Sequence, residues 1–208
     1  MNEDNYETLI KKTIETYDKI AKEYANKFKS IEPIKHLLKF FVKNIEGKRI
    51  LDAGCGHGRD CKYFSELGFE VYGIDLSEKL LEIAKKNAPE AKFFKMDMRK
   101  LEFPDEFFDG IWCCASFLHI PKKDAEKTLR EFYRVLKKNG ILFIAVKKGI
   151  GEKVMRKDYY KGGEKFFVFY TRDEIEELLR KVNFRIILTI IDKDDRGNTW
   201  IQVFCKKV

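Results

Sequence analysis

Short apolar runs alternate with stretches of helical periodicity from residue 49 onward, and this alternation constrains the fold more than any other feature. The apolar runs predict strands at 49–53, 69–74, 92–96, 108–114 and 141–146, with helices between most of them. Repeated strand–helix alternation is typical of a parallel sheet with helices on both faces. Two later runs, at 185–191 and 199–205, flank a loop of Asp, Arg, Gly and Asn, which predicts a hairpin and one antiparallel strand. The chain is therefore predicted to have an α/β fold.

Capping residues indicate where several helices begin. Ser77 is typical of an N-cap for a helix that runs to Asn87, and Thr171 with Glu174 forms the pattern of a capping box. The N-terminal part is helical throughout, and Pro33 suits the first turn of a helix that Gly47 ends. Before it, one long amphipathic helix is predicted from an apolar stripe at Ile10, Ile14, Tyr17, Ala21, Tyr24 and Phe28.

A chain of 208 residues is long enough for one core, so we expect a single domain over 1–208. Residues 1–47 would form a helical cap and 48–208 the α/β core. Within the core, segment 149–170 shows no clear element and is rich in lysine, glycine and aromatic residues. Long irregular segments are uncommon in compact domains, so this one is a candidate lid over a binding site.

The composition limits the classes of partner that the chain is expected to bind. Lys and Arg number 42 against 34 Asp and Glu, a net charge of +8, but the two signs mix along almost every segment. A nucleic-acid partner is therefore possible but not favoured, and nothing in the pattern specifies an oligomeric state. No apolar run approaches the roughly 20 residues of a membrane span, and residues 1–5 are polar and acidic, unlike a secretory leader. The five cysteines contain no Cys-x-x-Cys pair, so we expect free thiols, no metal site and a cytoplasmic location.

The segment Ile50-Leu-Asp-Ala-Gly-Cys-Gly-His-Gly58 lies between a predicted strand and a predicted helix. Glycine at such a turn lets the backbone approach a ligand, and in an open α/β sheet this turn lies at the ligand-binding edge. Gly54 and Gly56 fit the first two positions of a dinucleotide fingerprint, but Arg59 occupies the third. Asp52 would repel a pyrophosphate, and it could help to order an ammonium group. The turn therefore favours a nucleoside linked to an amino acid over a dinucleotide.

Two further acidic residues end predicted strands. Asp75 follows the second strand about 20 residues after the glycines, where a carboxylate can accept both ribose hydroxyls. Asp97 follows the third strand, where it can accept the amino group of adenine while Met98 covers the ring. A fourth segment, Phe108-Asp-Gly-Ile-Trp-Cys-Cys114, runs on to Leu118-His119.

These four motifs, in this order, resemble the class I S-adenosylmethionine-dependent methyltransferases, and in particular their small-molecule branch. The resemblance covers about residues 17–205. It implies a Rossmann-like, seven-stranded, mostly parallel sheet with an antiparallel last strand. It also implies S-adenosylmethionine as cofactor and methyl transfer to a small-molecule acceptor by in-line displacement.

The resemblance assigns cofactor-binding positions residue by residue. It implies that Asp52, Gly54, Cys55 and Gly56 hold the methionine moiety. Asp75 and Leu76 would hold the ribose and adenosine, and Asp97 and Met98 the adenine. Cys114 and Ala115 would line the pocket near the sulfonium. The segment 17–24 resembles a YDxxAxxY motif whose tyrosines, here Tyr17 and Tyr24, close over the cofactor in this branch; packing in the core is the alternative for both.

His119 is the one catalytic candidate, because it follows the fourth strand and faces the place expected for the methyl donor. It would position the acceptor or transfer a proton, and a purely structural histidine is the alternative. Arg59 and Asp60 would form a surface ion pair or support the methionine end. Three other functions stay open: methyl transfer to RNA or protein, a nicotinamide oxidoreductase, and a non-catalytic module that binds S-adenosylmethionine without turnover.

Overall fold

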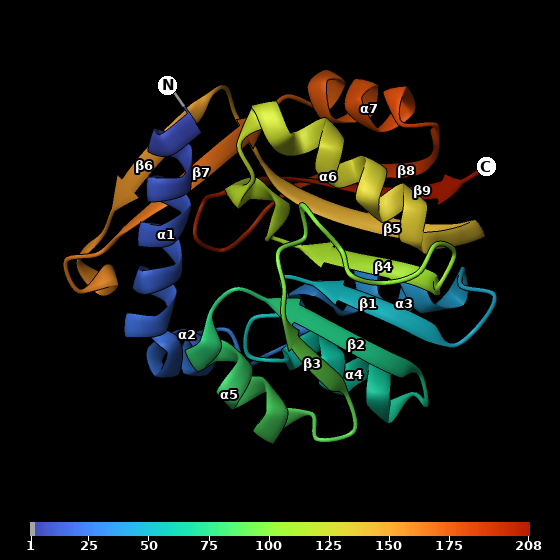
Figure 1. The fold of residues 1–208 in the computed structure, drawn as a ribbon, viewed down its shortest axis with the longest axis horizontal. Helices are drawn as coiled ribbons and strands as arrows, with labels where there is room; N and C mark the ends of the chain where they lie inside the picture. The colour runs from blue at the N-terminus through green and yellow to red at the C-terminus, as the bar shows by residue number, and fades with distance from the viewer. Residues whose placement is uncertain (1–2) are drawn as a thin grey trace.

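The computed structural model describes residues 3–208. The comparison of residues 1–5 with a secretory leader therefore falls partly outside the described residues, because it includes Met1 and Asn2. A single sheet runs through the molecule, with strands in the order β3-β2-β1-β4-β5 at its centre (Figure 1). These five strands are mutually parallel, as predicted. Their bounds are β1 (Arg49–Ala53), β2 (Glu70–Asp75), β3 (Lys92–Lys95), β4 (Phe108–Cys114) and β5 (Leu136–Lys148). β5 begins earlier than predicted, because Leu136 already pairs with Phe108.

The C-terminal hairpin, β8 (Phe184–Lys193) and β9 (Thr199–Lys207), completes the sheet. β9 inserts antiparallel between β5 and β8, which confirms the predicted antiparallel last strand. The predicted count of seven strands is too low, since the sheet has nine. The two additional strands, β6 (Glu152–Arg156) and β7 (Glu164–Tyr170), form a hairpin in the segment whose sequence showed no clear element.

β7 lies where β4 stops. Lys147 pairs with Trp200 of β9 and also with Phe169 of β7, so β7 and β9 lie on opposite edges of β5. The edge that β7 occupies is the one that β4 uses up to Cys114, which pairs with Ala145. The β6–β7 hairpin therefore extends the sheet beyond the carboxyl end of β4. This places the hairpin beside the strand ends where ligands bind in sheets of this kind.

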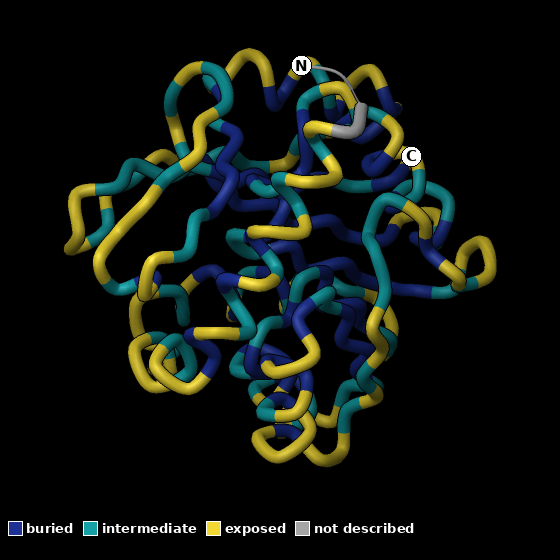
Figure 2. Tube along the Cα trace, turned by 60° about the vertical axis from the view of Figure 1, so that its left-hand side comes forward, coloured by how far each residue is buried: buried dark blue, intermediate teal, exposed yellow. Residues whose placement is uncertain are grey.

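Helices cover both faces of the sheet, as predicted (Figure 1). On one face pack α6 (Lys122–Val135) and α7 (Arg172–Lys181), and on the other α3 (Lys35–Lys43), α4 (Arg59–Glu66) and α5 (Glu78–Asn87). The predicted caps are confirmed: Ser77 accepts from the Leu80 N–H, and Thr171 with Glu174 forms a complete capping box. Pro33 lies in a short 3₁₀ turn, Glu32–Ile34, that leads into α3. In Figure 2 the buried chain runs through the sheet and the exposed residues lie on the outer turns.

The N-terminal segment is not the single long helix that its apolar stripe predicted. It forms α1 (Glu3–Lys19) and α2 (Ala21–Lys27), separated at Ile20, whose φ and ψ are −109° and 14°. The stripe is mostly half-buried, with Ala21 fully buried. α1 packs against β7 as well as α5, whereas α2 packs against α5. Tertiary packing thus overrides the continuous helical pattern. None of the helices in residues 3–208 is long and apolar enough to span a bilayer.

Candidate functional site

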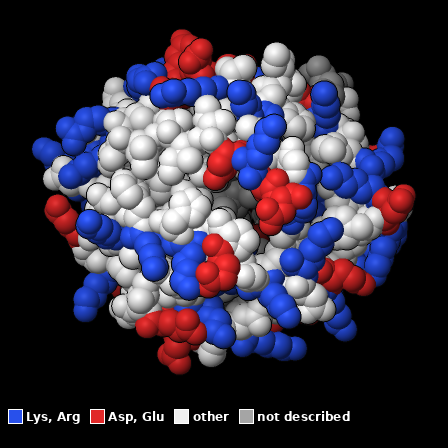
Figure 3. Space-filling view, turned by 180° about the vertical axis from the view of Figure 1, so that it is seen from behind, with Lys and Arg blue, Asp and Glu red and all other residues white. Residues whose placement is uncertain are grey.

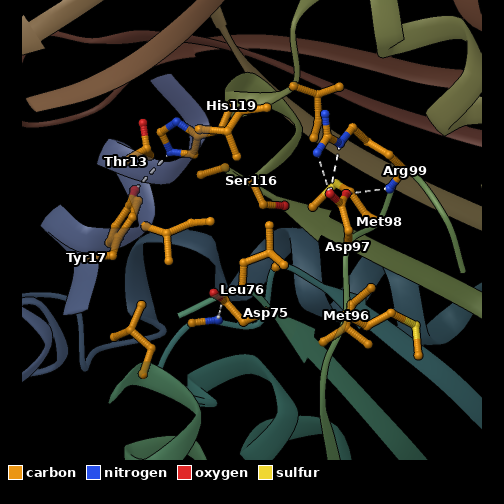
Figure 4. A pocket seen from close by; sticks show the side chains of 18 of the residues that line it. Thr13, Tyr17, Asp75, Leu76, Met96, Asp97, Met98, Arg99, Ser116 and His119 are labelled. Carbon is orange, nitrogen blue, oxygen red and sulfur yellow. Dashed lines mark hydrogen bonds and ion pairs between the residues drawn. The ribbon is translucent and has the colours of Figure 1, made fainter. Parts of the chain in front are cut away.

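The ends of β1, β2 and β4 and the segment after β3 surround one cavity, which we call the strand-end cavity (Figure 4). α1 covers it from the side with Ile10, Thr13 and Ile14. A second, outer cavity of about 650 Å³ lies beyond it, bounded by α2, the β6–β7 hairpin and the β8–β9 turn. Both cavities are lined by seven residues, which we call the shared wall: Tyr17, Tyr24, Gly54, Gly56, Cys114, Ala115 and His119.

The glycine turn after β1 has a backbone that only glycine adopts readily. Gly54, Gly56 and Gly58 have φ values of 82°, 54° and 77°. The N–H groups of Gly54 and Cys55 both donate to the Ile74 carbonyl, at 2.8 and 2.9 Å, which fixes the turn to the end of β2. A Cβ at Gly54 would lie 2.2 Å from the Ser116 Cβ, so the end of β4 approaches this backbone too closely for a side chain.

Asp75 joins the glycine turn to the next helix. One carboxylate oxygen accepts from the Gly56 N–H and the other from the Ser77 N–H, both at 2.9 Å. Burial raises the pKa of the Asp75 carboxyl, and these backbone donors oppose that shift. Each oxygen keeps a further lone pair, so the carboxylate can still accept hydroxyl groups from a ligand in the cavity. Leu76 lines the same cavity beside it.

Asp97 lines the cavity after β3, and its carboxylate is held by Arg99, at 2.7 and 2.9 Å from two guanidinium nitrogens. The same guanidinium binds Glu7 of α1 at 2.5 Å and reaches Asp124 of α6 at 3.4 Å. Arg99 also lines the cavity, and so connects the predicted adenine-binding residue to the helix that covers it. The sequence analysis missed Arg99, because two of its three partners, Glu7 and Asp124, lie 92 and 25 residues away and form no local motif with it.

Tyr17 and His119 form a hydrogen-bonded pair in the shared wall, with 3.0 Å between the Tyr17 hydroxyl and His119 Nε2. His119 Nδ1 lies 2.6 Å from the Phe166 carbonyl, which can only accept, so Nδ1 carries the hydrogen and Nε2 accepts from Tyr17. Burial lowers the pKa of His119 to about 3, so the imidazole is neutral near pH 7. Both ring nitrogens are thus engaged, and His119 positions the Tyr17 hydroxyl as well as the end of β4. A role in catalysis remains a prediction.

The predicted site residues divide between the two cavities. All but Asp52 and Cys55 line the strand-end cavity, and these two line the outer cavity instead. Asp52 is buried, and its carboxylate accepts from the Cys61 thiol at 3.1 Å. Burial and the neighbouring Asp60 raise the pKa of Asp52.

Arg59 and Asp60 do not form the surface pair offered as one interpretation. Asp60 is 6% exposed, accepts two hydrogen bonds from Arg59 and a third from the Trp112 indole at 2.9 Å. The pair lines the outer cavity next to the glycine turn, and the Trp112 indole connects it to the core.

Two segments far apart in the chain close the outer cavity. The β8–β9 turn places Arg196 over the Phe28 ring of the α2 end, with the guanidinium carbon 4.6 Å from the ring centroid. The β6–β7 hairpin contributes Tyr159, Tyr160 and Lys165. The hairpin was expected as a lid candidate from its composition. The β8–β9 turn was missed because its sequence predicts only a tight connection.

Comparisons with known proteins show which proteins the chain is similar to. Residues 51–144 match a family described as "Methyltransferase domain". A putative methyltransferase of Bacillus subtilis is 40% identical over 106 residues, which are 49% of this chain and 43% of that protein. The ubiquinone biosynthesis O-methyltransferase of Pelagibacter ubique is 33% identical over 158 residues, 66% of this chain and 65% of that protein.

Among solved structures, the Burkholderia thailandensis 1,6-didemethyltoxoflavin-N1-methyltransferase superposes with a TM-score of 0.79 at 19% identity, over 100% of this chain and 91% of that one. It was solved with bound 1,6-didemethyltoxoflavin and S-adenosylhomocysteine. The chain spans about half the length of the curated relatives it matches. The glycine turn, Asp75 and Asp97, which meet around one strand-end cavity, all lie in the segment that matches the methyltransferase domain, and the fold of the chain is similar to that of a solved methyltransferase.

Proposed function

We propose that this protein transfers a methyl group from S-adenosylmethionine to a small-molecule acceptor. The observation that carries the proposal is the shared wall. A ligand in the strand-end cavity and another in the outer cavity would meet at Gly54, Gly56 and Ala115, beside the packed rings of Tyr17 and Tyr24. A donor and an acceptor must meet in this way for direct transfer. Relatives named for acting on ubiquinone precursors and on 1,6-didemethyltoxoflavin support a small acceptor.

The side chains around the strand-end cavity fit the cofactor. Asp75 offers buried carboxylate oxygens for the ribose hydroxyls, while Leu76 and Met98 offer apolar surface for the adenine. At Gly56, an added Cβ would have the Tyr24 ring at 3.8 Å as its neighbour, so the missing side chain leaves open backbone at the cavity wall. That open backbone suits the methionine part of the cofactor. Asp52 is buried and accepts a hydrogen bond from Cys61, and its expected part in ordering the ammonium group stays a prediction.

When bound, the cofactor supplies a sulfonium whose methyl group is already activated for displacement. The protein's contribution is then to align the acceptor and exclude water, and orientation of this kind contributes up to roughly 7–11 kcal/mol in ideal cases. Tyr17 is held in place by His119, and Tyr24 packs edge-on against Tyr17 with ring centroids 5.3 Å apart. These rings would close the shared wall around the reacting atoms. A base is needed only where the acceptor atom is protonated.

The test is a binding and turnover experiment. Isothermal titration calorimetry should show binding of S-adenosylmethionine and S-adenosylhomocysteine, and a panel of small phenols, amines and carboxylic acids should yield S-adenosylhomocysteine with at least one acceptor. NADH serves as the control ligand. Binding of NADH without S-adenosylmethionine would overturn the proposal. Binding of S-adenosylmethionine with turnover only on RNA or protein would replace the small acceptor with a macromolecule.

A further inference from the structure

We propose that the acceptor carries an anionic group, and that Lys165 and Lys147 bind it in the outer cavity. This inference rests on the proposed function, because it assigns the chemical class of the molecule that occupies that cavity. Four observations carry it: two lysines without ion pairs, an aromatic enclosure around them, two cavity acids that are hydrogen-bonded elsewhere, and one open hydrogen-bond acceptor.

Lys165 is a buried cation, 2% exposed, and no carboxylate or hydrogen-bond acceptor pairs with its ammonium group in residues 3–208. Its Nζ lies 3.3 Å from the centroid of the Tyr17 ring and 4.6 Å from that of Tyr160. Tyr24 and Tyr159 complete the enclosure at 5.3 and 5.8 Å. Cation–π contacts offset only part of the cost of removing an ammonium group from water.

Lys147 is a second cation in the same cavity, half-buried and likewise without an ion pair in the described chain. Its Nζ lies 4.7 Å from the Phe167 ring centroid and 5.7 Å from that of Trp200. Lys165 and Lys147 both lie close enough to His119 of the shared wall to lower its pKa. Two like charges therefore face one space next to the expected position of the methyl group, and an anion there would satisfy both.

Two acids that line the outer cavity, Asp192 and Asp194, are hydrogen-bonded to groups other than these lysines. Asp194 accepts from the backbone and side chain of Asn198 and from the Trp200 indole, which holds it within its own turn. Asp192 accepts from Gln202 Nε2 at 3.1 Å. Because that bond requires the amide nitrogen of Gln202 to point to Asp192, the amide oxygen points away and is buried without a hydrogen-bond partner.

The unpartnered amide oxygen of Gln202 predicts a second feature of the ligand, a hydrogen-bond donor. Gln202 is 6% exposed and lines the outer cavity, so an N–H or O–H donor on the acceptor would satisfy it. The arrangement thus suits a small molecule with an anionic group and a hydrogen-bond donor, flanked by aromatic rings. Carboxylate and phosphate share the required chemistry, and the experiment separates them.

The test uses the protein saturated with S-adenosylhomocysteine, and titrates it by calorimetry with 4-hydroxybenzoate, its neutral analogue 4-hydroxybenzamide, and phenyl phosphate. We expect at least one of the two anions to bind at least about tenfold more tightly than the amide; the tighter one identifies the anionic group. Lys165→Met and Lys147→Met should each weaken that anion at least about tenfold, the loss of one charge-assisted contact. Lys138→Met, at an exposed position near the opposite end of β5, should leave it unchanged.

The inference and the proposed function fail in different ways. If S-adenosylhomocysteine binds but the amide binds as well as both anions, or if neither lysine variant changes anion affinity, the anionic acceptor is wrong and methyl transfer stands. If S-adenosylhomocysteine itself does not bind, the proposed function fails first. The lysine variants should keep S-adenosylhomocysteine affinity within a few-fold, which shows that they are folded.

Discussion

Asp75 connects the fold to the proposed cofactor site, because its carboxylate already accepts two backbone N–H groups before any ligand is considered. The sequence predicts that this carboxylate accepts the ribose hydroxyls. The structure adds a second role, since truncation would also leave the N–H groups of Gly56 and Ser77 without an acceptor.

Two replacements of Asp75 should therefore distinguish its effect on ligand affinity from its effect on the free energy of unfolding. We expect Asp75→Asn and Asp75→Ala both to weaken S-adenosylhomocysteine binding, by roughly 1.5–3 kcal/mol for the charge-assisted contacts. Only Asp75→Ala leaves both backbone donors unpaired, and it should lower the free energy of unfolding by a further roughly 1–3 kcal/mol. Calorimetry and urea unfolding measure the two effects. Unchanged affinity in Asp75→Asn would show that the carboxylate does not contact the ligand.

Lys165 should make the protein less stable at neutral pH than it would be without this lysine. Burial and the neighbouring Lys147 and Lys157 lower the pKa of Lys165 from 10.5 to about 7. Between these values the unfolded chain binds a proton that the folded chain does not, so stability rises with pH across this window and is flat below it. The other titratable groups near its ammonium are tyrosines and the neutral His119: Tyr17, Tyr24, Tyr159, Tyr160.

Lys165→Met should accordingly raise the midpoint of thermal unfolding at pH 7. The gain has an upper bound of about 5 kcal/mol, at about 1.4 kcal/mol per pKa unit, and should shrink as the pH approaches 10.5. Thermal scans from pH 6 to 10 on this variant, with Lys138→Met as control, measure it. A variant that is less stable than the parent at every pH would mean that the ring contacts outweigh the cost of burial.

At the level of elements, α1 and the β6–β7 hairpin form one unit. Thr16 and Thr13 of α1 accept from the N–H groups of Glu164 and Phe166, at 3.0 and 2.9 Å, and so satisfy the free edge of β7. Lys12 pairs with Glu164 at 2.9 Å, and Tyr6 donates to Glu152 of β6 at 2.7 Å.

We expect this unit to act as the lid over the two cavities, with both parts responding together. Hydrogen exchange measured with and without S-adenosylhomocysteine should show slower exchange in α1 and in residues 152–170, while α7, which lines neither cavity, serves as internal reference. Thr13→Val with Thr16→Val removes the acceptors for β7 and should speed exchange in both parts. Protection confined to the glycine turn and α5 would mean that α1 and the hairpin are a fixed wall.

For the whole molecule, ligand binding is expected to appear as global stabilisation, because the strand ends of the central sheet and both N-terminal helices contribute to one site. At one hundred times its dissociation constant, S-adenosylhomocysteine should stabilise the fold by about 2.7 kcal/mol. For a chain of this size that corresponds to a rise of roughly 5–11 °C in the unfolding midpoint. NADH at the same concentration should give no shift, and an equal shift with NADH would contradict the assigned ligand.

The surface charge agrees with a small acceptor rather than a polyanion. The net charge is +8, yet on the face in Figure 3 Lys and Arg are interspersed with Asp and Glu around a central hollow. Many of these charges form pairs on the surface, such as Lys92 with Glu70 and Arg130 with Glu126. The unpaired cations at Lys147 and Lys165 lie inside the outer cavity instead.

Local sequence determined the parts of this protein that depend on near neighbours. The parallel strands, the glycine turn with its positive φ angles, the caps at Ser77 and Thr171, and the positions of Asp75 and Asp97 at strand ends all follow from residue types and short spacings. The carboxyl ends of parallel strands share one edge, so placing each motif at the end of a strand was enough to bring them together.

Tertiary structure alone decided the rest. The break at Ile20 separates α1, which packs against β7 and α5, from α2, which packs against α5, and the β6–β7 hairpin is held by an edge of β5 that β4 leaves free. Arg99 meets Glu7 across 92 residues, and Lys165 enters a ring enclosure that two helices and a 3₁₀ turn supply. Such contacts join residues with no fixed spacing in the chain, and their energies depend on burial, which a linear pattern does not specify.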